Sequence, residues 1–444
     1  MTHTVGIEAL GVALPSTYLE LEALAQARGV PPGKYIDGLG TTRMAVPLPD
    51  EDTVTLAAQA ARMALESAGA SPESIGLLAV GTETAVDHSK PVSSYVQGLL
   101  GVGRHCRVFE TKHACYGGTA ALQLAVDWVR SGSARGRKAL IVCSDIARYG
   151  IGTAGEPTQG AGAVALLVSD EPKILELDAG LSGVWSNDVH DFWRPLYSKD
   201  ALVDGHYSVR CYLDALGGAY AHYKELAGAP GVPFFSERFA ALAYHVPYGK
   251  MARKAHRHLR AVDGDQDADA SFDRLVGPSL ILPAQAGNLY TGSLYLALAS
   301  LLTCSPRPLD GARIGLFSYG SGSCAEFFSG TVNPGAQARV RSLGLPALFE
   351  GRRSLSVDEY EEIMRARDAA HDERPFAELP RDTDYHFLGV REHRRTYSAP
   401  ALPIAALDDP RASGPRLREL RSPEPPALAL PPGPEGGLVA ANRP

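Results

Sequence analysis

Hydrophobic positions in the first half of the chain follow two different spacings. Residues 53–69 and 120–129 carry alanine and leucine at the intervals of an amphipathic helix. Short apolar runs, which are typical of fully buried strands, lie at residues 75–80, 138–143 and 162–169. Strands separated by helices of this length predict an α/β fold with a mostly parallel sheet.

The second half repeats this order of elements. Apolar runs at residues 239–245 and 312–318 predict strands. Residues 251–259 and 288–302 predict helices, and the second of these is rich in small residues. Both halves therefore follow one scheme.

Two pairs of segments support a duplication. Residues 114–122 and 288–296 both pass from a polar turn into a helix of small residues, and residues 161–170 and 318–327 are both glycine-rich passages beside a strand. The similarity suggests two copies of one α/β unit that face each other. A site is then expected between the N-termini of the two related helices.

We divide the chain into three parts on this basis. The first unit is expected at residues 1–171 and the second at residues 172–399. Residues 400–444 are dense in proline, alanine and arginine and have no apolar periodicity, so they predict a disordered tail.

Composition excludes several classes of protein. The 444 residues are 45% hydrophobic and 21% charged, as in ordinary soluble enzymes. A net charge of -7 leaves no excess of cations for a nucleic acid. Residues 1–19 lack the features of a signal peptide. The longest apolar run, at residues 294–302, is far short of the roughly 20 residues that span a bilayer.

The cysteines give no sign of a disulfide framework or a zinc site. They stand at positions 106, 115, 143, 211, 304 and 324, without a C-x-x-C pair. In so large a chain they are expected to be reduced thiols in a cytoplasmic protein. Any one of them is more often a small buried hydrophobe than a reactive group.

Cys115 is the exception because of its neighbours. Gly117 and Gly118 follow it closely, and the alanine-rich stretch behind them predicts a helix. Cys115 therefore lies at or near a helix N-terminus, where unpaired N–H groups and the macrodipole stabilise a thiolate. A buried structural cysteine would not need two glycines there. The pattern predicts a nucleophile.

Glu83 and His245 follow apolar strands in the two halves. A carboxylate just past a buried strand occupies a position typical of a general base, although such a residue is more often a cap or a solvated loop residue. A histidine flanked by apolar residues is more often a satisfied core histidine. Together with Cys115 they form the set that acyl transfer with enolate formation needs.

Two further features are candidate ligand contacts. The glycine-rich passages at residues 155–162 and 318–323 could present backbone N–H groups to a thioester, or they could be tight turns in a packed core. A basic run shares one helical face, which is usually solvated but could receive a phosphate: Lys250, Arg253, Lys254 and Arg257.

At this point the chain resembles the 3-hydroxy-3-methylglutaryl-CoA (HMG-CoA) synthase family of the thiolase-like superfamily. The resemblance covers residues 4–398. It rests on these segments: the cysteine box at 112–121, GTETAVD at 81–87, SDIARYG at 144–150, GEPTQGAGAVA at 155–165, HDFWRP at 190–195, YHVP at 244–247, GNLYTGS at 287–293 and FSYGSGS at 317–323.

The resemblance implies a role for each matched residue. Cys115 is acylated, Glu83 removes a methyl proton, and His245 holds and polarises the β-keto acceptor. Tyr149, Asn288 and Ser321 are similar to residues that contact the acyl groups or the acceptor, and Asp191 to one that supports the site. By position, Lys250 is assigned to substrate binding. The superfamily implies a duplicated five-layer αβαβα fold, a homodimer, and neither a metal nor a redox cofactor.

Two versions of the family fit the sequence. One condenses acetyl-CoA with acetoacetyl-CoA in the mevalonate pathway, and the other takes its acyl groups from acyl carrier proteins in polyketide β-branching. The amino-acid sequence of residues 113–121 and 207–223 favours the β-branching version. A catalytically silent scaffold that binds carrier proteins is the alternative from another class. Ketoacyl synthases and thiolases are disfavoured, because Glu83 occupies the base position.

Overall fold

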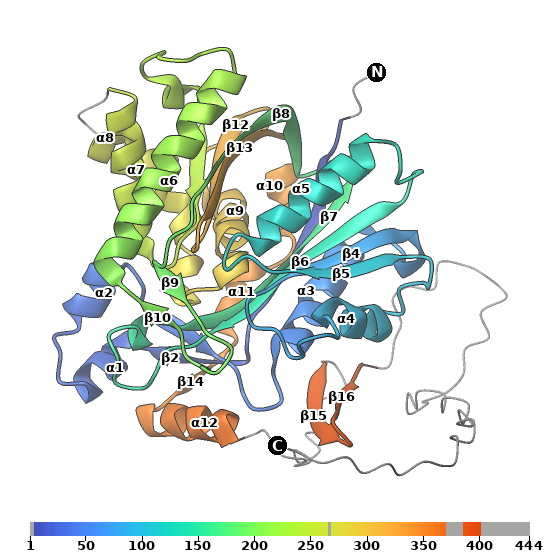
Figure 1. Cartoon of the computed structure of the whole chain (residues 1–444), viewed down its shortest axis with the longest axis vertical. Coiled ribbons are helices and arrows are strands. Elements are labelled where there is room, and N and C mark those ends of the chain that lie inside the picture. The colour runs from blue at the N-terminus through green and yellow to red at the C-terminus, as the bar shows by residue number, and fades with distance from the viewer. Residues whose placement is uncertain (1–3, 265–267, 370–384, 401–444) are drawn as a thin grey trace, which may run out of the picture. The chain divides into compact units, whose positions relative to one another are not determined.

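A large sheet crosses the part of the chain that the computed structural model describes, which is residues 4–264, 268–369 and 385–400 (Figure 1). Nine strands form it within those residues. In order across the sheet they are β11 (Ala241–Tyr244), β12 (Arg313–Gly320), β13 (Cys324–Val332), β8 (Leu175–Ser186), β1 (Gly6–Ala13), β7 (Gly160–Ser169), β6 (Lys138–Ala147), β4 (Ile75–Gly81) and β5 (Arg107–Thr111).

The expectation of a mostly parallel sheet is wrong. Only β4 with β5, β4 with β6, and β11 with β12 pair in parallel, and the other neighbours in this sheet are antiparallel. A parallel crossover needs a connection of a dozen or more residues, usually a helix. Residues 321–323 between β12 and β13 are too short for one, and residues 148–159 between β6 and β7 form no α-helix.

The sheet consists of two halves that meet at a narrow joint. Strand β8 pairs with β1 at only two positions, Gly6 with Glu176 and Ile7 with Leu175. A Cβ atom on Gly6 would collide with the carbonyl oxygen of Leu175, so this close approach requires glycine. The order α5–β6–β7 in the first half recurs as α9–β12–β13 in the second, which confirms the predicted duplication.

Helices cover both faces of each half-sheet and form the predicted five layers (Figure 1). On β6, Leu140 belongs to the apolar cluster around α3, and Ile141 belongs to the cluster that holds α5 and α9. On β13, Glu326 faces α5 and Phe327 packs on α6. The layer helices are α3 (Thr53–Ala68), α4 (Val92–Leu100), α5 (Gly117–Arg130), α6 (Gly205–Leu226), α7 (Gly249–Val262) and α9 (Ser293–Cys304).

Smaller elements surround this framework. The helices are α1 (Leu21–Ala27), α2 (Gly33–Leu39), α8 (Ala268–Leu275), α10 (Ala336–Arg341), α11 (Leu345–Glu350) and α12 (Val357–Ala369). The strands are β2 (Thr17–Glu20), β3 (Arg43–Val46), β14 (Arg353–Leu355), β9 (Phe192–Trp193), β10 (Leu202–Val203), β15 (His386–Arg391) and β16 (Arg394–Ser398). None of the helices in the described ranges is long and apolar enough to span a membrane.

Most predicted elements lie where the periodicity placed them, with one clear correction. The helix expected from residue 288 begins at Ser293, because a 3₁₀ turn at Tyr290–Gly292 precedes it. The division at residues 171 and 172 stays a prediction. The predicted tail, except for its first residue, lies outside the described residues, which end at 400.

Candidate active site

Cys115 lies in a tight turn between β5 and α5. Tyr116 is the N-cap of α5, and Ala114 has a φ of 38°, in the left-handed region that costs a non-glycine residue about 1–3 kcal/mol. A Cβ on Gly81 at the end of β4 would collide with Gly118, and one on Gly320 at the end of β12 would crowd Tyr116. One glycine from each half therefore lets the backbone of this turn fit between the two half-sheets.

The Cys115 thiol donates a hydrogen bond to Glu83, with 3.1 Å between Sγ and Oε1. Glu83 stands two residues beyond β4, as predicted. Burial and the Asp145 carboxylate raise the pKa of Glu83 to about 8, although the Cys115 hydrogen bond and the Arg194 charge oppose this shift. The two side chains are therefore close enough to exchange a proton.

The expectation that the helix N-terminus stabilises a Cys115 thiolate is wrong for the free protein. Burial raises the pKa of Cys115 well above its usual range, and the charge and hydrogen bond of Glu83 raise it further. Asp145 and Asp191 act in the same direction. Burial first, and then three carboxylates brought from other elements, therefore favour the protonated thiol.

Asp145 is a component of this site that the sequence analysis did not single out as a site residue. It is 0% exposed and accepts hydrogen bonds from the backbone N–H of Glu83 at 2.9 Å and of Thr291 at 3.1 Å. Hydroxyl groups complete its shell: those of Thr82, Thr84 and Thr291. A carboxylate near the end of β6, after the apolar run at residues 139–143, was the available signal.

His245 reaches the same place from the second half. It follows β11 directly. Its backbone N–H donates to the carbonyl of Phe317 at 2.7 Å, and its backbone carbonyl accepts the Tyr212 hydroxyl at 2.8 Å. Burial lowers the pKa of His245 to about 3, so the imidazole is neutral at physiological pH. A neutral imidazole can donate one N–H to a carbonyl oxygen without carrying charge.

Cys115 and His245 line one cavity of about 380 Å³, whereas Glu83 and Asp145 are not among the residues that line it. Five of the predicted site residues line it: Cys115, Tyr149, His245, Asn288 and Ser321. Much of the remaining wall is apolar and aromatic, including Phe192, Met251 and Tyr290. Both halves of the chain contribute to it, as the duplication predicted.

Comparison with known proteins identifies this arrangement. Family profiles described as hydroxymethylglutaryl-coenzyme A synthase N terminal and C terminal match residues 1–173 and residues 175–271 with 265–399. Hydroxymethylglutaryl-CoA synthase of Enterococcus faecalis is 42% identical over 364 residues, which cover 81% of this chain and 91% of that protein. The chain belongs to the HMG-CoA synthase family.

Solved structures agree with this assignment. The protein MvaS in complex with 3-hydroxy-3-methylglutaryl coenzyme A is 51% identical, with a TM-score of 0.85 over 90% of this chain and 100% of that one. The HMG synthase of the curacin biosynthetic pathway, in complex with an acetyl donor ACP, is 36% identical, with a TM-score of 0.83 over 89% and 100%. The fold is thiolase-like and the chain is an acyltransferase of the HMG-CoA synthase type.

The remaining residues inferred from the family resemblance have distinct positions. Asp191 is 0% exposed and accepts the Tyr319 hydroxyl at 2.6 Å and the Gly322 N–H at 3.0 Å, so it fixes the turn that carries Ser321. The amide oxygen of Asn288 accepts from the Tyr290 N–H and the Ser293 hydroxyl. Its NH₂ group is thereby left to contact a ligand. The roles of all these residues stay predictions.

The two ends of the glycine-rich passage at residues 155–162 lie in different surroundings, and its contact with a thioester stays a prediction. Gly155 lines the cavity. A Cβ on Gly160, in contrast, would collide with the backbone of residues 286–288, so this glycine allows β7 to pack against the segment that carries Asn288. One end of the passage thus borders the ligand space and the other is a close core contact.

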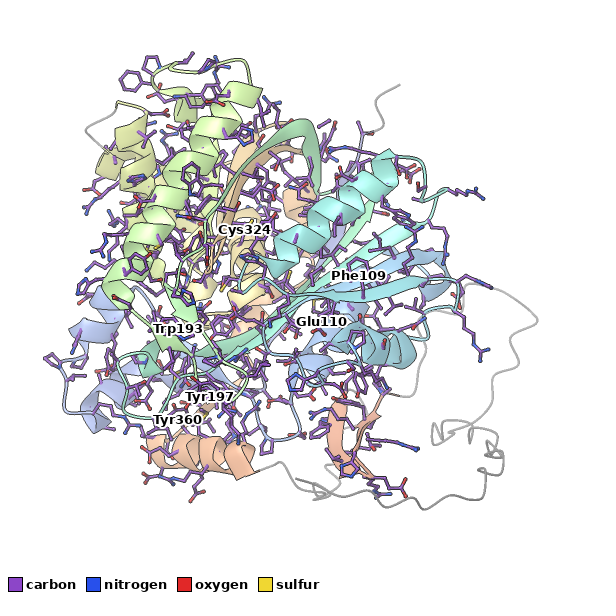
Figure 2. The ribbon with its side chains drawn as sticks, in the orientation of Figure 1. Phe109, Glu110, Trp193, Tyr197, Cys324 and Tyr360 are labelled. Atoms are coloured by element: carbon purple, nitrogen blue, oxygen red, sulfur yellow. The ribbon has the colours of Figure 1, made fainter. Side chains whose placement is uncertain are left out.

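Tyr149 is held by a chain of contacts that extends to α12. Its N–H donates to Gln159 at 2.9 Å, and the Gln159 amide donates to the Tyr360 hydroxyl at 2.8 Å. Tyr360, labelled on α12 in Figure 2, donates in turn to the buried Glu156 at 3.2 Å. Arg28 pairs with Glu156 at 2.8 Å. The wall that carries Tyr149 therefore depends on residues far away in the sequence.

The basic run on α7 is partly neutralised. Arg253 and Arg257 pair with Asp269 of α8 at 3.0 Å and 2.6 Å. Lys250 is exposed at the start of α7 and is not among the residues that line the cavity, although Tyr248 and Met251 beside it are. Within the described ranges, Lys250 and Lys254 form no ion pair. Lys250 as a substrate contact stays a prediction.

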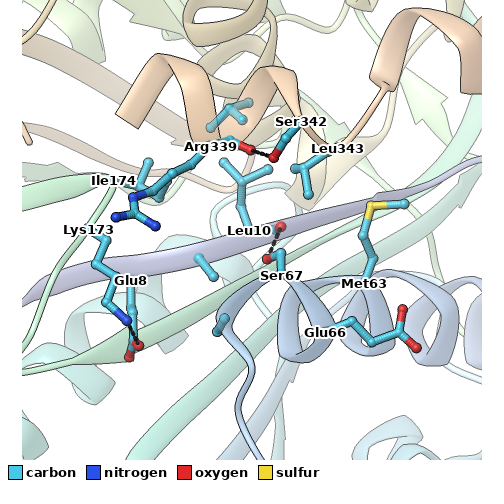
Figure 3. A pocket seen from close by; sticks show the side chains of 13 residues that line it. Glu8, Leu10, Met63, Glu66, Ser67, Lys173, Ile174, Arg339, Ser342 and Leu343 are labelled. Atoms are coloured by element: carbon cyan, nitrogen blue, oxygen red, sulfur yellow. Dashed lines mark hydrogen bonds and ion pairs between the residues drawn. The ribbon is translucent and has the colours of Figure 1, made fainter. Parts of the chain in front are cut away.

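A second cavity, of about 310 Å³, lies between β1, α3 and α10 (Figure 3). Leu10, Met63 and Ile174 supply part of its apolar lining, and Lys173 at its edge pairs with Glu8 at 2.9 Å. Its described lining contains neither cysteine nor histidine. The chemistry of the family therefore belongs to the cavity at Cys115.

Proposed function

We propose that the protein condenses a Cys115-bound acetyl group with a β-ketoacyl thioester. The main supporting observation is the 3.1 Å contact of Glu83 with Cys115, which lines one cavity together with His245 from the other half. The Cys115 thiol attacks the donor thioester, and the proton that it gives up leaves with the donor thiol. Glu83, in its ionised form, then removes a proton from the acetyl methyl group.

His245 has the complementary role at the acceptor. Its neutral imidazole donates a hydrogen bond to the β-keto carbonyl, which becomes an alkoxide when the acetyl carbon attacks it. Asn288 is positioned to donate to a thioester carbonyl from the same wall. Water must then cleave the bond to Cys115. The acyl groups arrive on a carrier thiol, so we propose that the reaction uses neither a metal nor a redox cofactor.

The pH dependence of condensation follows from the pKa of Glu83. Glu83 must be ionised to act as a base, and its pKa is about 8. We expect kcat to rise about tenfold per pH unit below that value and to level off above it. A kcat profile from pH 6 to pH 9.5 measures this, with Glu83→Gln as the control that lacks the inflection. A flat or falling profile would contradict the assignment.

We further propose that both acyl groups arrive on coenzyme A. Identity to MvaS, solved with an HMG-CoA ligand, is 51%, against 36% to the curacin synthase solved with a donor ACP. The ion pairs of Arg253 and Arg257 with Asp269 support the same choice. They leave Lys250 and Lys254 of the basic run to bind a compact nucleotide, and they remove the broad basic face that a carrier protein would use. Coenzyme A as the carrier is the opposite of the β-branching version that the sequence of residues 113–121 and 207–223 favours.

An acyl carrier protein as donor is the second candidate. The loop between β9 and β10 begins beside Phe192 of the cavity, and the side chains of Leu196 and Tyr197 in it are 83% and 89% exposed. Tyr197 is labelled in Figure 2. An exposed apolar loop beside an active-site entrance suits a protein surface. The same loop is available to a second copy of the chain, and a homodimer stays a prediction, as does a cytoplasmic location.

The donor is decided by a comparison of kcat/KM at matched ionic strength. Acetyl-CoA is expected to outperform acetyl-carrier protein by at least about tenfold, or about 1.4 kcal/mol of transition-state binding. Acetyl-pantetheine is the matched control, since it keeps the shared arm and lacks the nucleotide. Faster transfer from the carrier protein, without turnover of acetoacetyl-CoA, would establish the β-branching version instead.

A further inference from the structure

A buried carboxylate without a cation stands beside the nucleophile turn. Glu326 on β13 is 2% exposed, and within the described residues no lysine, arginine or histidine pairs with it. Its donors are all uncharged: Tyr116, Gln123 and Ser182. Burial of an unpaired carboxylate is costly, so a site that retains one without a cation calls for an explanation.

The two oxygens of Glu326 serve different parts of the fold. Oε2 accepts the Tyr116 hydroxyl at 2.7 Å, whereas Oε1 accepts the Gln123 amide at 2.5 Å and the Ser182 hydroxyl. Tyr116 and Gln123 belong to the first half of the chain, at the start and middle of α5. Ser182 is on β8 in the second half, as is β13 itself, whose first residue, Cys324, is labelled in Figure 2. One carboxylate therefore bridges the two halves.

A second contact repeats this bridge one helical turn further along. Ser318 on β12 is the cross-strand partner of Glu326, and the Thr119 hydroxyl donates to it at 2.7 Å. Tyr116 and Thr119 are three residues apart, so they lie on one face of the first turn of α5. The second half-sheet thus holds α5 by hydrogen bonds at its N-terminal end, next to Cys115.

We propose that Glu326 is a positioning residue for Cys115. It acts through Tyr116, the residue next to the nucleophile, and sets the orientation of the Cys115 turn toward Glu83. Tyr116 is the N-cap of α5, and Ala114 on the other side of Cys115 is in a strained conformation that its surroundings must impose. The proposal rests on the proposed function only in taking Cys115 as the nucleophile.

Two substitutions, each of a residue that donates a hydrogen bond to Glu326, separate the positioning of Cys115 from a contribution to the stability of the fold. Tyr116→Phe removes the hydroxyl bound to Oε2, and Ser182→Ala removes one bound to Oε1, so each variant loses one hydroxyl. In single-turnover acetylation with acetyl-CoA, we expect Tyr116→Phe to lower the rate constant by about tenfold with an unchanged amplitude, because small displacements of reacting groups are costly. Ser182→Ala should retain the rate constant of the unmodified protein.

Alkylation of Cys115 by iodoacetamide gives a readout that does not depend on catalysis. The contact with Glu83 raises the pKa of Cys115, so a turn released from Glu326 should show a lower thiol pKa in its alkylation profile. We expect that decrease in Tyr116→Phe and in Glu326→Gln, and an unchanged profile in Ser182→Ala. Glu326→Gln provides a second variant in case one of the others folds poorly.

The outcomes separate this proposal from the proposed function. Equal rate constants and equal alkylation profiles for Tyr116→Phe and Ser182→Ala would overturn the positioning role. A smaller amplitude at an unchanged rate constant would also overturn it, because it would show that Tyr116 only maintains the folded fraction. Absence of acetylation in the unmodified protein would refute the proposed function, and the alkylation profiles would still decide whether Glu326 positions the thiol.

Discussion

The Cys115→Ala protein is expected to accept no acetyl group and to form no condensed product. No other described cysteine lines the cavity, so the variant has no thiol with which to form the acyl intermediate. Loss of a catalytic nucleophile typically lowers kcat by about 10⁴–10⁶-fold. The fold should be retained, because alanine fills the turn without a new clash.

Intact mass and peptide mapping after incubation with acetyl-CoA measure this effect. Cys304→Ala is the matched control, since Cys304 is also a partly buried free thiol, at the end of α9 and outside the cavity. It should be acetylated as fully as the unmodified protein. Acetyl transfer to another residue, or condensation by Cys115→Ala, would refute the assignment of the nucleophile.

Glu83→Ala is expected to separate the two halves of the reaction. Removing the carboxylate removes the charge and the hydrogen bond that raise the pKa of Cys115, so the thiol becomes easier to ionise and acetylation should continue. The methyl proton then has no base, and condensation should slow by about 10²–10⁴-fold. The variant should therefore accumulate as the acetyl-enzyme.

Single-turnover acetylation and steady-state condensation, measured on the same preparation, test this separation. Glu83→Asp is a useful companion, because it keeps a carboxylate but moves it back from the sulfur. It should recover part of the condensation rate. If Glu83→Ala remained unacetylated, the carboxylate would instead be needed to activate the thiol, and its role would have to be reassigned.

The principal site residues could be predicted because each follows a strand or precedes a helix that has a clear local pattern. Cys115, Glu83 and His245 follow this rule, and parallel neighbours such as β4 and β5 bring such ends to one edge of a sheet. Their electrostatics could not be predicted in the same way. The pKa of Cys115 is raised first by burial, then by Glu83, Asp145 and Asp191, and both the burial and these contacts are set by the packing of other elements.

Long-range contacts account for the other differences from expectation. The basic run on α7 was visible in the sequence, but its neutralisation by Asp269 requires α8 to lie beside it. The antiparallel pairs were missed because helical and strand periodicity does not specify strand direction. The role proposed for Glu326 depends on the register of β12 with β13, which a single sequence does not contain.

The raised pKa of Cys115 also predicts how the idle protein responds to oxidants. Peroxide and other cellular oxidants attack the thiolate far faster than the thiol. Because burial and Glu83 keep the Cys115 thiol protonated, we expect it to be converted slowly to sulfenic or sulfinic acid between turnovers. We therefore expect Glu83 to slow the oxidation of Cys115 in addition to its role as the base.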